Sequence, residues 1–241
     1  MLDWLRRAPS EEPVIDLGGR VLPVVIRRLA HAKRMTLRLA PDGSAVRISI
    51  PRWGRTADAL DFAARRRAWL AGQLDRLPAP VPAEPDGTMA FRGEAFRIAH
   101  DPAASRRPAL EGAIVRIGGP AESVSTRLRR WLEAEARREL ITDLDYYCAQ
   151  IDRAPPKLAL SNARRRWGSC AADGAIRINW RLIMAPDAVR RSVVAHEVAH
   201  LVHFDHSPRF HALLARIYEH DIDEADRWLK REGRSLYQPF G

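Results

Sequence analysis

Histidine is the residue type whose spacing most clearly points to chemistry in this chain. Six of the eight histidines lie between residues 196 and 220. Residues 196–200 read HEVAH, and on a helix His196 and His200 would share one face and could bind one Zn²⁺. Glu197 would lie beside them, placed to reach a zinc-bound water rather than the metal. Zinc lowers the pKa of such a water toward about 7, so the pattern predicts hydrolysis with Glu197 as general base.

A catalytic zinc of this kind needs a third protein ligand. His203 lies seven residues beyond His196, about 10.5 Å along a helix, which is too far for both rings to reach one ion. His206 directly precedes Ser207, where the chain must reverse before the next helix, so its ring can turn back. We therefore predict His206 as the third ligand, with Glu219 as the main alternative. The remaining histidines of the group are expected at helix surfaces or beside the ligands: His203, His211 and His220.

A second segment rich in unusual residues lies upstream of the histidines. Gly168 and Ser169 are expected to shape a loop beside the metal. Cys170 would be a zinc ligand, a redox switch or a small buried hydrophobe, and we favour the last. A strand at 175–180 would present an edge on which an extended peptide can pair. The candidate residues for shaping the site or binding substrate are Trp167, Gly168, Ser169, Cys170 and Asn179.

The elements that must position these residues follow from hydrophobic periodicity. The first 50 residues alternate as short strands, and an apolar stripe predicts one helix from about residue 57 to 77. A Pro-rich linker at 78–87 follows, and then more short strands up to about residue 117. A long helix begins near Ser123, and a strand covers 176–182. The HEVAH helix is expected from Pro186 to about His203, and the next begins at Ser207-Pro208.

Composition restricts the class of protein. The 241 residues are 46% hydrophobic and 29% charged, which is typical of a globular chain. No apolar run is long enough for a transmembrane helix, the N-terminus lacks a secretory signal, and only two cysteines occur. We expect a cytoplasmic protein with no membrane partner. The net charge is +10 and is carried almost wholly by arginine. It allows a nucleic-acid partner without requiring one, and we expect solvated faces instead.

Three segments resemble a known family. They are RRWGSC at 165–170, IRINWRL at 176–182 and HEVAHLVHFDHSPRF at 196–210. Together they are similar to the YgjP-like metallopeptidases, predicted metal-dependent hydrolases related to the WLM and SprT-like zinc proteases. The resemblance implies a zincin-like α+β fold, zinc held by three histidines and a glutamate base. The residues concerned are His196, His200, His206 and Glu197. His203 stands where the longer metzincin pattern has a turn glycine, so the turn must differ from that of metzincins.

The sequence therefore predicts an α+β protein with two parts. A β-rich part with one helix would cover 1–118, and a zincin-like catalytic domain would cover 119–241. The predicted function is a zinc metallopeptidase with one Zn²⁺ per chain and a peptide or protein substrate. Two alternatives stay open. One is a metal-dependent pyrophosphohydrolase of nucleotides such as UTP. The other is a binding module with a structural zinc, for which Cys170 would supply the fourth ligand.

Overall fold

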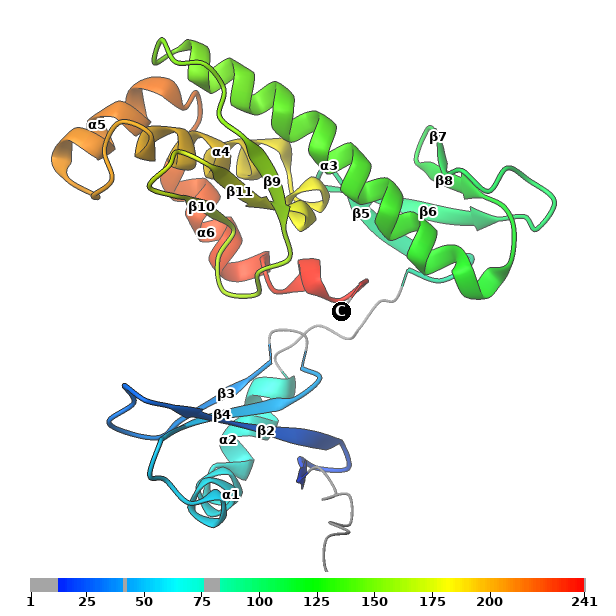
Figure 1. Ribbon diagram of the computed structural model, residues 1–241. Coiled ribbons are helices and arrows are strands. Elements are labelled where there is room, and N and C mark those ends of the chain that lie inside the picture. Colours follow the sequence, from blue (N-terminus) through cyan, green and yellow to red (C-terminus); the bar gives the residue numbers. More distant parts are fainter. Residues whose placement is uncertain (1–12, 41–42, 76–82, 241) are drawn as a thin grey trace, which may run out of the picture. The chain divides into compact units, whose positions relative to one another are not determined.

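The computed structural model describes residues 13–40, 43–75 and 83–240 (Figure 1). The chain divides into two compact units, Met1–Pro78 and Ala79–Gly241, which we call the N-terminal and C-terminal units. Each unit has an apolar core of its own. Both units combine helices and sheets, so the predicted mixed α+β class is confirmed.

The division between the units differs from the predicted boundary at residue 118. Strands that follow residue 87 share a core with the long helix after them, so they belong to the C-terminal unit. The predicted linker at 78–87 coincides with the division, although its residues 78–82 lie outside the described residues. No helix in the described part of the chain is long and apolar enough to cross a membrane.

The N-terminal unit is a four-stranded sheet packed against two helices. Val46, Ile48 and Ile50 are buried and alternate with outward residues, which confirms the predicted strand. The strand order is β1-β2-β4-β3, and the only parallel pair in this sheet is β2 with β4. The elements are β1 (Val14–Asp16), β2 (Val21–Leu29), β3 (Thr36–Leu39), β4 (Val46–Pro51), α1 (Thr56–Arg65) and α2 (Arg67–Asp75).

The single helix predicted over 57–77 is two helices in the structure. α1 ends at Arg65, and Arg66 leaves helical geometry with φ −100° and ψ 10° before α2 begins. The buried residues of the two helices still follow one apolar stripe, because both pack on the same sheet. These residues are Ala59, Ala63, Leu70 and Leu74. Apolar spacing alone therefore could not reveal the break, and residues 76–77 lie outside the described ones.

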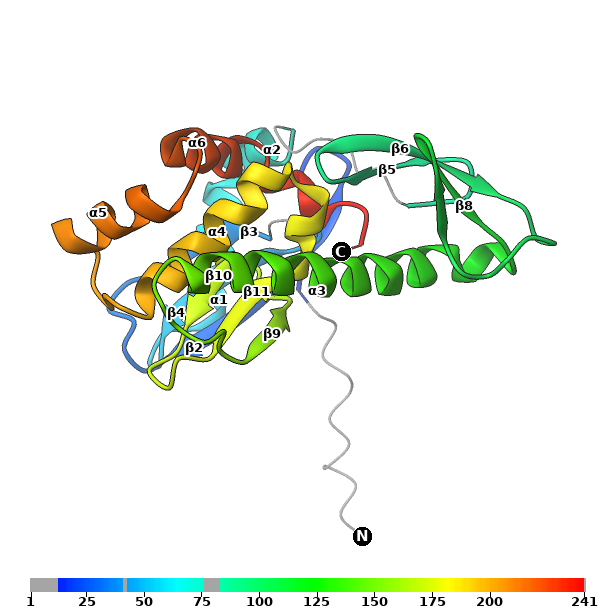
Figure 2. The same ribbon diagram turned by 90° about the horizontal axis from the view of Figure 1, so that it is seen from above.

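The C-terminal unit is organised around one long helix, α3 (Val124–Ala149), preceded by the 3-10 turn η1 (Ala121–Ser123). Its buried side chains recur every three or four residues, as the sequence predicts for a core helix. Figures 1 and 2 show α3 passing a four-stranded sheet at one end and the remaining elements at the other. The sheet has the order β5-β6-β8-β7 and comprises β5 (Thr88–Phe91), β6 (Glu94–His100), β7 (Ala109–Glu111) and β8 (Ile114–Ile117).

The other end of α3 packs with a three-stranded sheet and the remaining helices of the unit. The strand order is β10-β11-β9, with β11 parallel to β9 and antiparallel to β10. The strands are β9 (Leu158–Ser161), β10 (Gly168–Cys170) and β11 (Ile176–Asn179). The helices are η2 (Trp180–Met184), α4 (Asp187–His200), α5 (Pro208–Ile217), α6 (Ile222–Glu232) and η3 (Ser235–Tyr237).

The sheet order corrects one expectation. β11 is the predicted strand near 175–180, but it lies in the centre of its sheet, with β10 on one side and β9 on the other. Both of its edges are therefore paired, and it offers no free edge to a peptide. The edge strand nearest in the chain to the histidine segment at 196–206 is instead β10.

The tight turn between β5 and β6 packs against the segment that leads into α4. The backbone N–H of Arg92 donates to the carbonyl of Ile183 at 2.8 Å, and that of Gly93 donates to Met184 at 3.2 Å. Gly93 has φ +84° and lies so close to Pro186 that a side chain would collide with it. The guanidinium of Arg92 also pairs with Asp187 at the start of α4. These contacts fix where α4 begins.

Candidate metal centre

α4 presents three of the predicted site residues on two adjacent turns. It begins at Asp187 directly after Pro186, as the sequence predicts, but it ends at His200 rather than at His203. Its apolar face is buried against α3 and β11. Arg190, which is 2% exposed, donates to Asp143 of α3 at 2.8 Å and fixes the helix along its axis. The predicted HEVAH helix is thus held on its buried side, with its histidines at the C-terminal end.

Three imidazoles meet beyond this end of α4. Nε2 of His196 lies 3.1 Å from Nε2 of His200 and 3.2 Å from Nε2 of His206. One nitrogen from each ring lies within 4.8 Å of the others, and this is the group of possible metal ligands that the described residues contain. Tetrahedral zinc ligands at about 2.1 Å lie about 3.4 Å apart, so the observed spacing fits one zinc ion. The donor set, three imidazole nitrogens, also suits zinc.

The loop between α4 and α5 brings His206 back to the pair. The first turn of α5 begins at Pro208, and Phe210 of that turn is fully buried. Its ring lies 5.0, 4.6 and 4.8 Å, centroid to centroid, from the rings of His196, His200 and His206 respectively. The Phe210 ring therefore packs against all three imidazoles and limits how each can rotate.

One further contact orients His200. Its Nδ1 lies 3.0 Å from the carbonyl oxygen of His203, so the proton of a neutral ring belongs on Nδ1 and the lone pair on Nε2. Nε2 is the atom that faces the other two rings. His203 thus contacts His200 through its backbone carbonyl, and its side chain is not in the three-imidazole group.

The ring of His196 is neutral at physiological pH. Burial, together with the neighbouring imidazoles of His200, His206 and His211, lowers its pKa to about 4. A metal ligand must offer an unprotonated nitrogen, so this environment favours metal binding over protonation.

The carboxyl group of Glu197 is held between α4 and β10. It is 6% exposed and accepts a hydrogen bond from the backbone N–H of Cys170. Burial raises its pKa to about 7, and the Cys170 hydrogen bond and the charge of Arg166 only partly oppose this. Gly168 of β10 lies so close to the carboxylate that it leaves no room for a side chain. A carboxyl group with a pKa in this range can both accept and return a proton near neutral pH.

Glu219, the alternative third ligand, is bound elsewhere. Its carboxylate accepts a hydrogen bond from the hydroxyl of Tyr147 at 2.7 Å and pairs with Arg191. Arg191 in turn pairs with the buried carboxylate of Asp143 at 3.1 Å. Although burial opposes it, the hydrogen bonds from Arg191 and Tyr147 hold the pKa of Glu219 below its ordinary value. Glu219 belongs to a network that ties α3 to α4, and it is not in the three-imidazole group.

Of the other predicted site residues, some contact Glu197 and the rest pack elsewhere in the unit. Gly168 and Cys170 contact Glu197, as described above, and the thiol of Cys170 is not among the grouped ligand atoms. Ser169 lies opposite Arg177 in the sheet and is half-buried. Trp167 packs against Tyr237, with 5.6 Å between ring centroids, and so joins β10 to the C-terminal segment.

Asn179 is a framework residue. Its amide donates to the carbonyl of Ala163 at 2.9 Å and to the hydroxyl of Tyr237 at 3.0 Å, and its oxygen accepts from the N–H of Arg181. These bonds cap η2 and hold the loop before β10. Sequence analysis missed Phe210 and Tyr147. Their signal was only a position on apolar helix faces, which every core residue shares.

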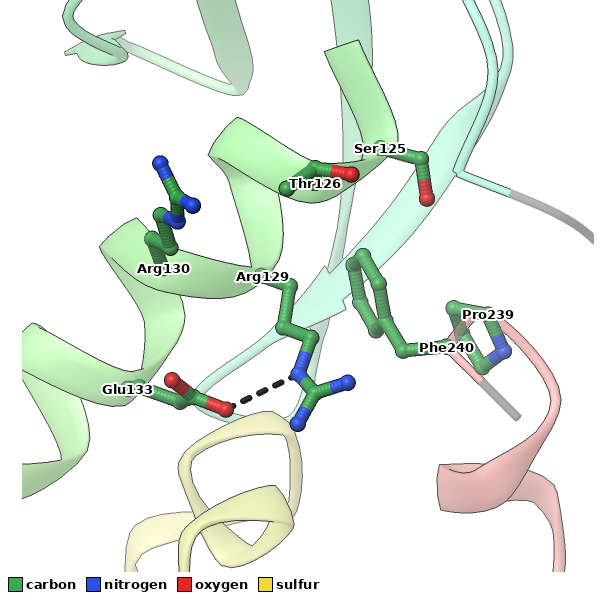
Figure 3. Close-up of a pocket in the computed structure, with 7 residues that line it drawn as sticks. All are labelled: Ser125, Thr126, Arg129, Arg130, Glu133, Pro239 and Phe240. Atoms are coloured by element: carbon green, nitrogen blue, oxygen red, sulfur yellow. Dashed lines mark hydrogen bonds and ion pairs between the residues drawn. The ribbon is translucent and has the colours of Figure 1, made fainter. Parts of the chain in front are cut away.

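A surface depression in the C-terminal unit is separate from the imidazole group. It lies between the first turns of α3 and the C-terminal segment, and Arg129 in it pairs with Glu133 (Figure 3). Its lining residues are Ser125, Thr126, Arg129, Arg130, Glu133, Pro239 and Phe240. None of them touches the three histidines or Glu197, so we do not assign it to the metal centre.

Three clustered imidazoles, two of them from α4, beside a buried glutamate of the same helix are the arrangement of a metal-dependent hydrolase. The model of the family described as YgjP-like, metallopeptidase domain, matches residues 33–232, and the chain belongs to this family. The match confirms the resemblance of the sequence segments. It begins inside the N-terminal unit and covers nearly all of the C-terminal one. Searches of curated proteins and of solved structures gave no match.

Proposed function

We propose that the chain is a zinc-dependent peptidase in which His196, His200 and His206 hold the metal and Glu197 is the general base. The observation that carries the proposal is the meeting of the three Nε2 atoms beside a buried glutamate. When bound, zinc would supply Lewis acidity, which lowers the pKa of water and polarises a carbonyl oxygen. The family supports a metal-dependent hydrolase, and the choice of zinc rests on the imidazole donor set.

The residues of the chain provide the proton transfer. The backbone N–H of Cys170 holds the carboxylate of Glu197 in one orientation, and burial brings its pKa near 7. In this state Glu197 can take a proton from the attacking water and then give it to the leaving amine. The lowered pKa of His196 keeps that ring unprotonated at pH 7, with its nitrogen available to a metal.

The free edge of β10 supports a peptide as substrate. Trp167 and Ala171 flank β10. The carbonyl of Trp167 accepts from the N–H of Asn179 in β11, and the N–H of Ala171 donates to the carbonyl of Ala175, directly before β11. In an antiparallel pair these groups alternate, so the backbone of Gly168 and Cys170 faces away from β11. The N–H of Cys170 goes to Glu197, and that of Gly168 points along the same open edge. An extended peptide can pair there next to the general base.

The two alternatives have less support. A nucleotide pyrophosphohydrolase would suit a carboxylate-held Mg²⁺, whereas the ligands here are three imidazoles. A structural zinc would need a fourth protein ligand, and the thiol of Cys170 lies near the carbonyl of Ala171 instead, at 3.6 Å. Three ligands leave one position open, as in catalytic zinc sites.

The test compares the purified full chain with its Glu197→Gln variant on casein and on UTP in parallel. We expect casein cleavage that a zinc chelator stops and added zinc restores. The variant should keep its zinc and lose about 10²–10⁴-fold in rate, because only the base is removed. Glu94→Gln, an exposed glutamate on β6, is the matched control and should cleave normally. Metal-dependent hydrolysis of UTP without casein cleavage would overturn the peptidase proposal in favour of a nucleotide pyrophosphohydrolase.

A further inference from the structure

The positive charge of the chain is concentrated away from the proposed catalytic unit. The N-terminal unit, Met1–Pro78, has 15 Lys and Arg against 8 Asp and Glu, so it carries +7 of the net +10 in about a third of the residues. The metal centre lies wholly in the other unit, which carries the remaining +3. Most of the basic excess therefore belongs to the unit that does not contain the three histidines.

The four-stranded sheet of the N-terminal unit has two unlike faces. Val24, Val46, Ile48 and Ile50 are buried on the face that packs against α1 and α2 (Figure 1). Strand alternation places their neighbours on the opposite face. In register across β2, β4 and β3, these neighbours form one row of Val25, Arg47 and Arg38, and a second row of Arg27, Ser49 and Thr36. We call this the open face, since its arginines are all exposed.

The arginines of the open face repel each other. Arg38 and Arg47 lie directly opposite in an antiparallel pair, where side chains start about 5 Å apart and like charges are destabilising. Within the described residues, neither they nor Arg27 makes an ion pair. Asp16 is the acid that strand register places on this face, but it lies opposite Val21, six residues along β2 from Arg27. A bound polyanion would remove the repulsion that the protein itself leaves uncompensated.

An exposed tryptophan lies at one end of the same sheet. Trp53 follows the last residue of β4 by two positions and is 81% exposed. Arg52 and Arg55 lie on either side of it in the chain. Burying an indole is favourable, so one left this open is available for stacking. Stacking of bases on aromatic rings and phosphate contacts from arginine are the two elements of single-strand nucleic-acid binding.

We propose that the open face, defined by Arg27, Arg38 and Arg47, together with Trp53 binds a single-stranded nucleic acid without sequence preference. The guanidinium groups of the arginines bind successive phosphates, and the indole of Trp53 stacks on a base. Phosphate contacts and base stacking carry little sequence information, so we expect no sequence preference. The proposed site lies in the N-terminal unit, whereas the three histidines and Glu197 belong to the C-terminal unit.

Binding of a fluorescent 20-nucleotide thymidine strand to the full chain, followed by anisotropy at several salt concentrations, tests the proposal. Three phosphate contacts predict that the logarithm of the association constant falls with the logarithm of salt with a slope of about −2. The double variant Arg38→Gln/Arg47→Gln should reduce the magnitude of this slope by about 1.4 and weaken binding about 25-fold at 0.1 M salt. Trp53→Ala should weaken binding with the slope unchanged.

The matched control removes the same charge from the other unit. Arg107 and Arg137 are exposed, and Arg107→Gln/Arg137→Gln should leave affinity and slope as in the wild type. An equal loss in both double variants would mean that net charge alone attracts the strand, and would overturn the proposal. Binding to vesicles rich in phosphatidylserine but not to the oligonucleotide would overturn it in favour of a membrane surface. Thermal unfolding of each variant, and Arg27→Gln/Arg47→Gln as a second pair, exclude misfolding as the cause.

Discussion

Gly168 and Glu197 are in such close contact that the glycine defines the space for the carboxylate. A Cβ at position 168 would lie 2.3 Å from Oε1 and 2.7 Å from Cγ of Glu197. No real Cβ approaches an atom so closely, and Gly168 is fixed in β10 opposite Ile178. A glycine of the sheet therefore sets the position of the proposed general base on the helix.

Gly168→Ala should displace the carboxylate and abolish most catalysis. We expect about a 10²-fold loss of peptide hydrolysis, since a misplaced base loses most of its effect, while zinc content stays at one per chain. Gly72→Ala, in α2, is the control, because a Cβ there meets nothing within 4 Å. It should leave the rate unchanged. Normal hydrolysis by Gly168→Ala would show that the carboxylate needs no such space.

His206 and Glu219 can be distinguished by metal affinity. His206→Ala removes one imidazole of the three, and we expect zinc affinity to fall by at least about 10²-fold in a competition with a chelator. Glu219→Ala should keep its zinc. It should instead lower the free energy of unfolding by about 1–3 kcal/mol, because the hydroxyl of Tyr147 and the guanidinium of Arg191 lose their partner. The reverse result would make Glu219 the ligand.

Phe210 should matter for the metal as well as for the fold. Phe210→Leu removes the ring that touches all three imidazoles, so we expect zinc affinity to fall about 10-fold and stability to fall by about 1–2 kcal/mol. Phe91→Leu alters a buried ring in the other part of the same core. It should lose similar stability with unchanged zinc affinity. Equal zinc affinity in both variants would show that Phe210 contributes to packing but not to zinc binding.

The ion pairs at the start of α4 predict a stability change in acid. Burial opposes ionisation of Asp187, but hydrogen bonds and charges from Arg92 and Arg190 outweigh it and hold its pKa below the ordinary value. A carboxyl group whose pKa is lowered by folding stabilises the protein above its unfolded pKa, about 3.9. This contribution is lost as the pH falls through the lower folded value.

Asp187→Asn should therefore be less stable than the wild type by about 1–2 kcal/mol at pH 7 and at pH 5. The difference should shrink as the pH drops below about 4, because the wild-type carboxyl group then becomes protonated. Urea unfolding of both proteins from pH 7 to pH 3 measures it. A constant difference over this range would mean that the charge of Asp187 contributes nothing.

The sequence was most informative where one element carries the whole signal. The periodic apolar residues of α3 and the i, i+4 spacing of His196 and His200 are local, and the structure has both as expected. His206 was also accessible, because the helix start at Ser207-Pro208 requires a reversal just before it. The family match agrees with these segments.

The rest depends on contacts between elements that are far apart in the chain. Which strand lies at the sheet edge follows from packing, so β11 could not be recognised as central. Glu219 looked like a ligand because its residue type fits, whereas its partners Tyr147 and Arg191 come from α3 and α4. The close approach of Gly168 to Glu197 has no sequence signal beyond the glycine itself.

The packing of α3 restricts where insertions and deletions can occur in the chain. One apolar stripe contacts the four-stranded sheet at the first half of the helix, where Phe91 packs on Trp131, and α4 at the second, where Asp143 pairs with Arg190. An inserted or deleted residue between them would rotate one half against the other by about 100°. Natural relatives should therefore show no gap within residues 131–143.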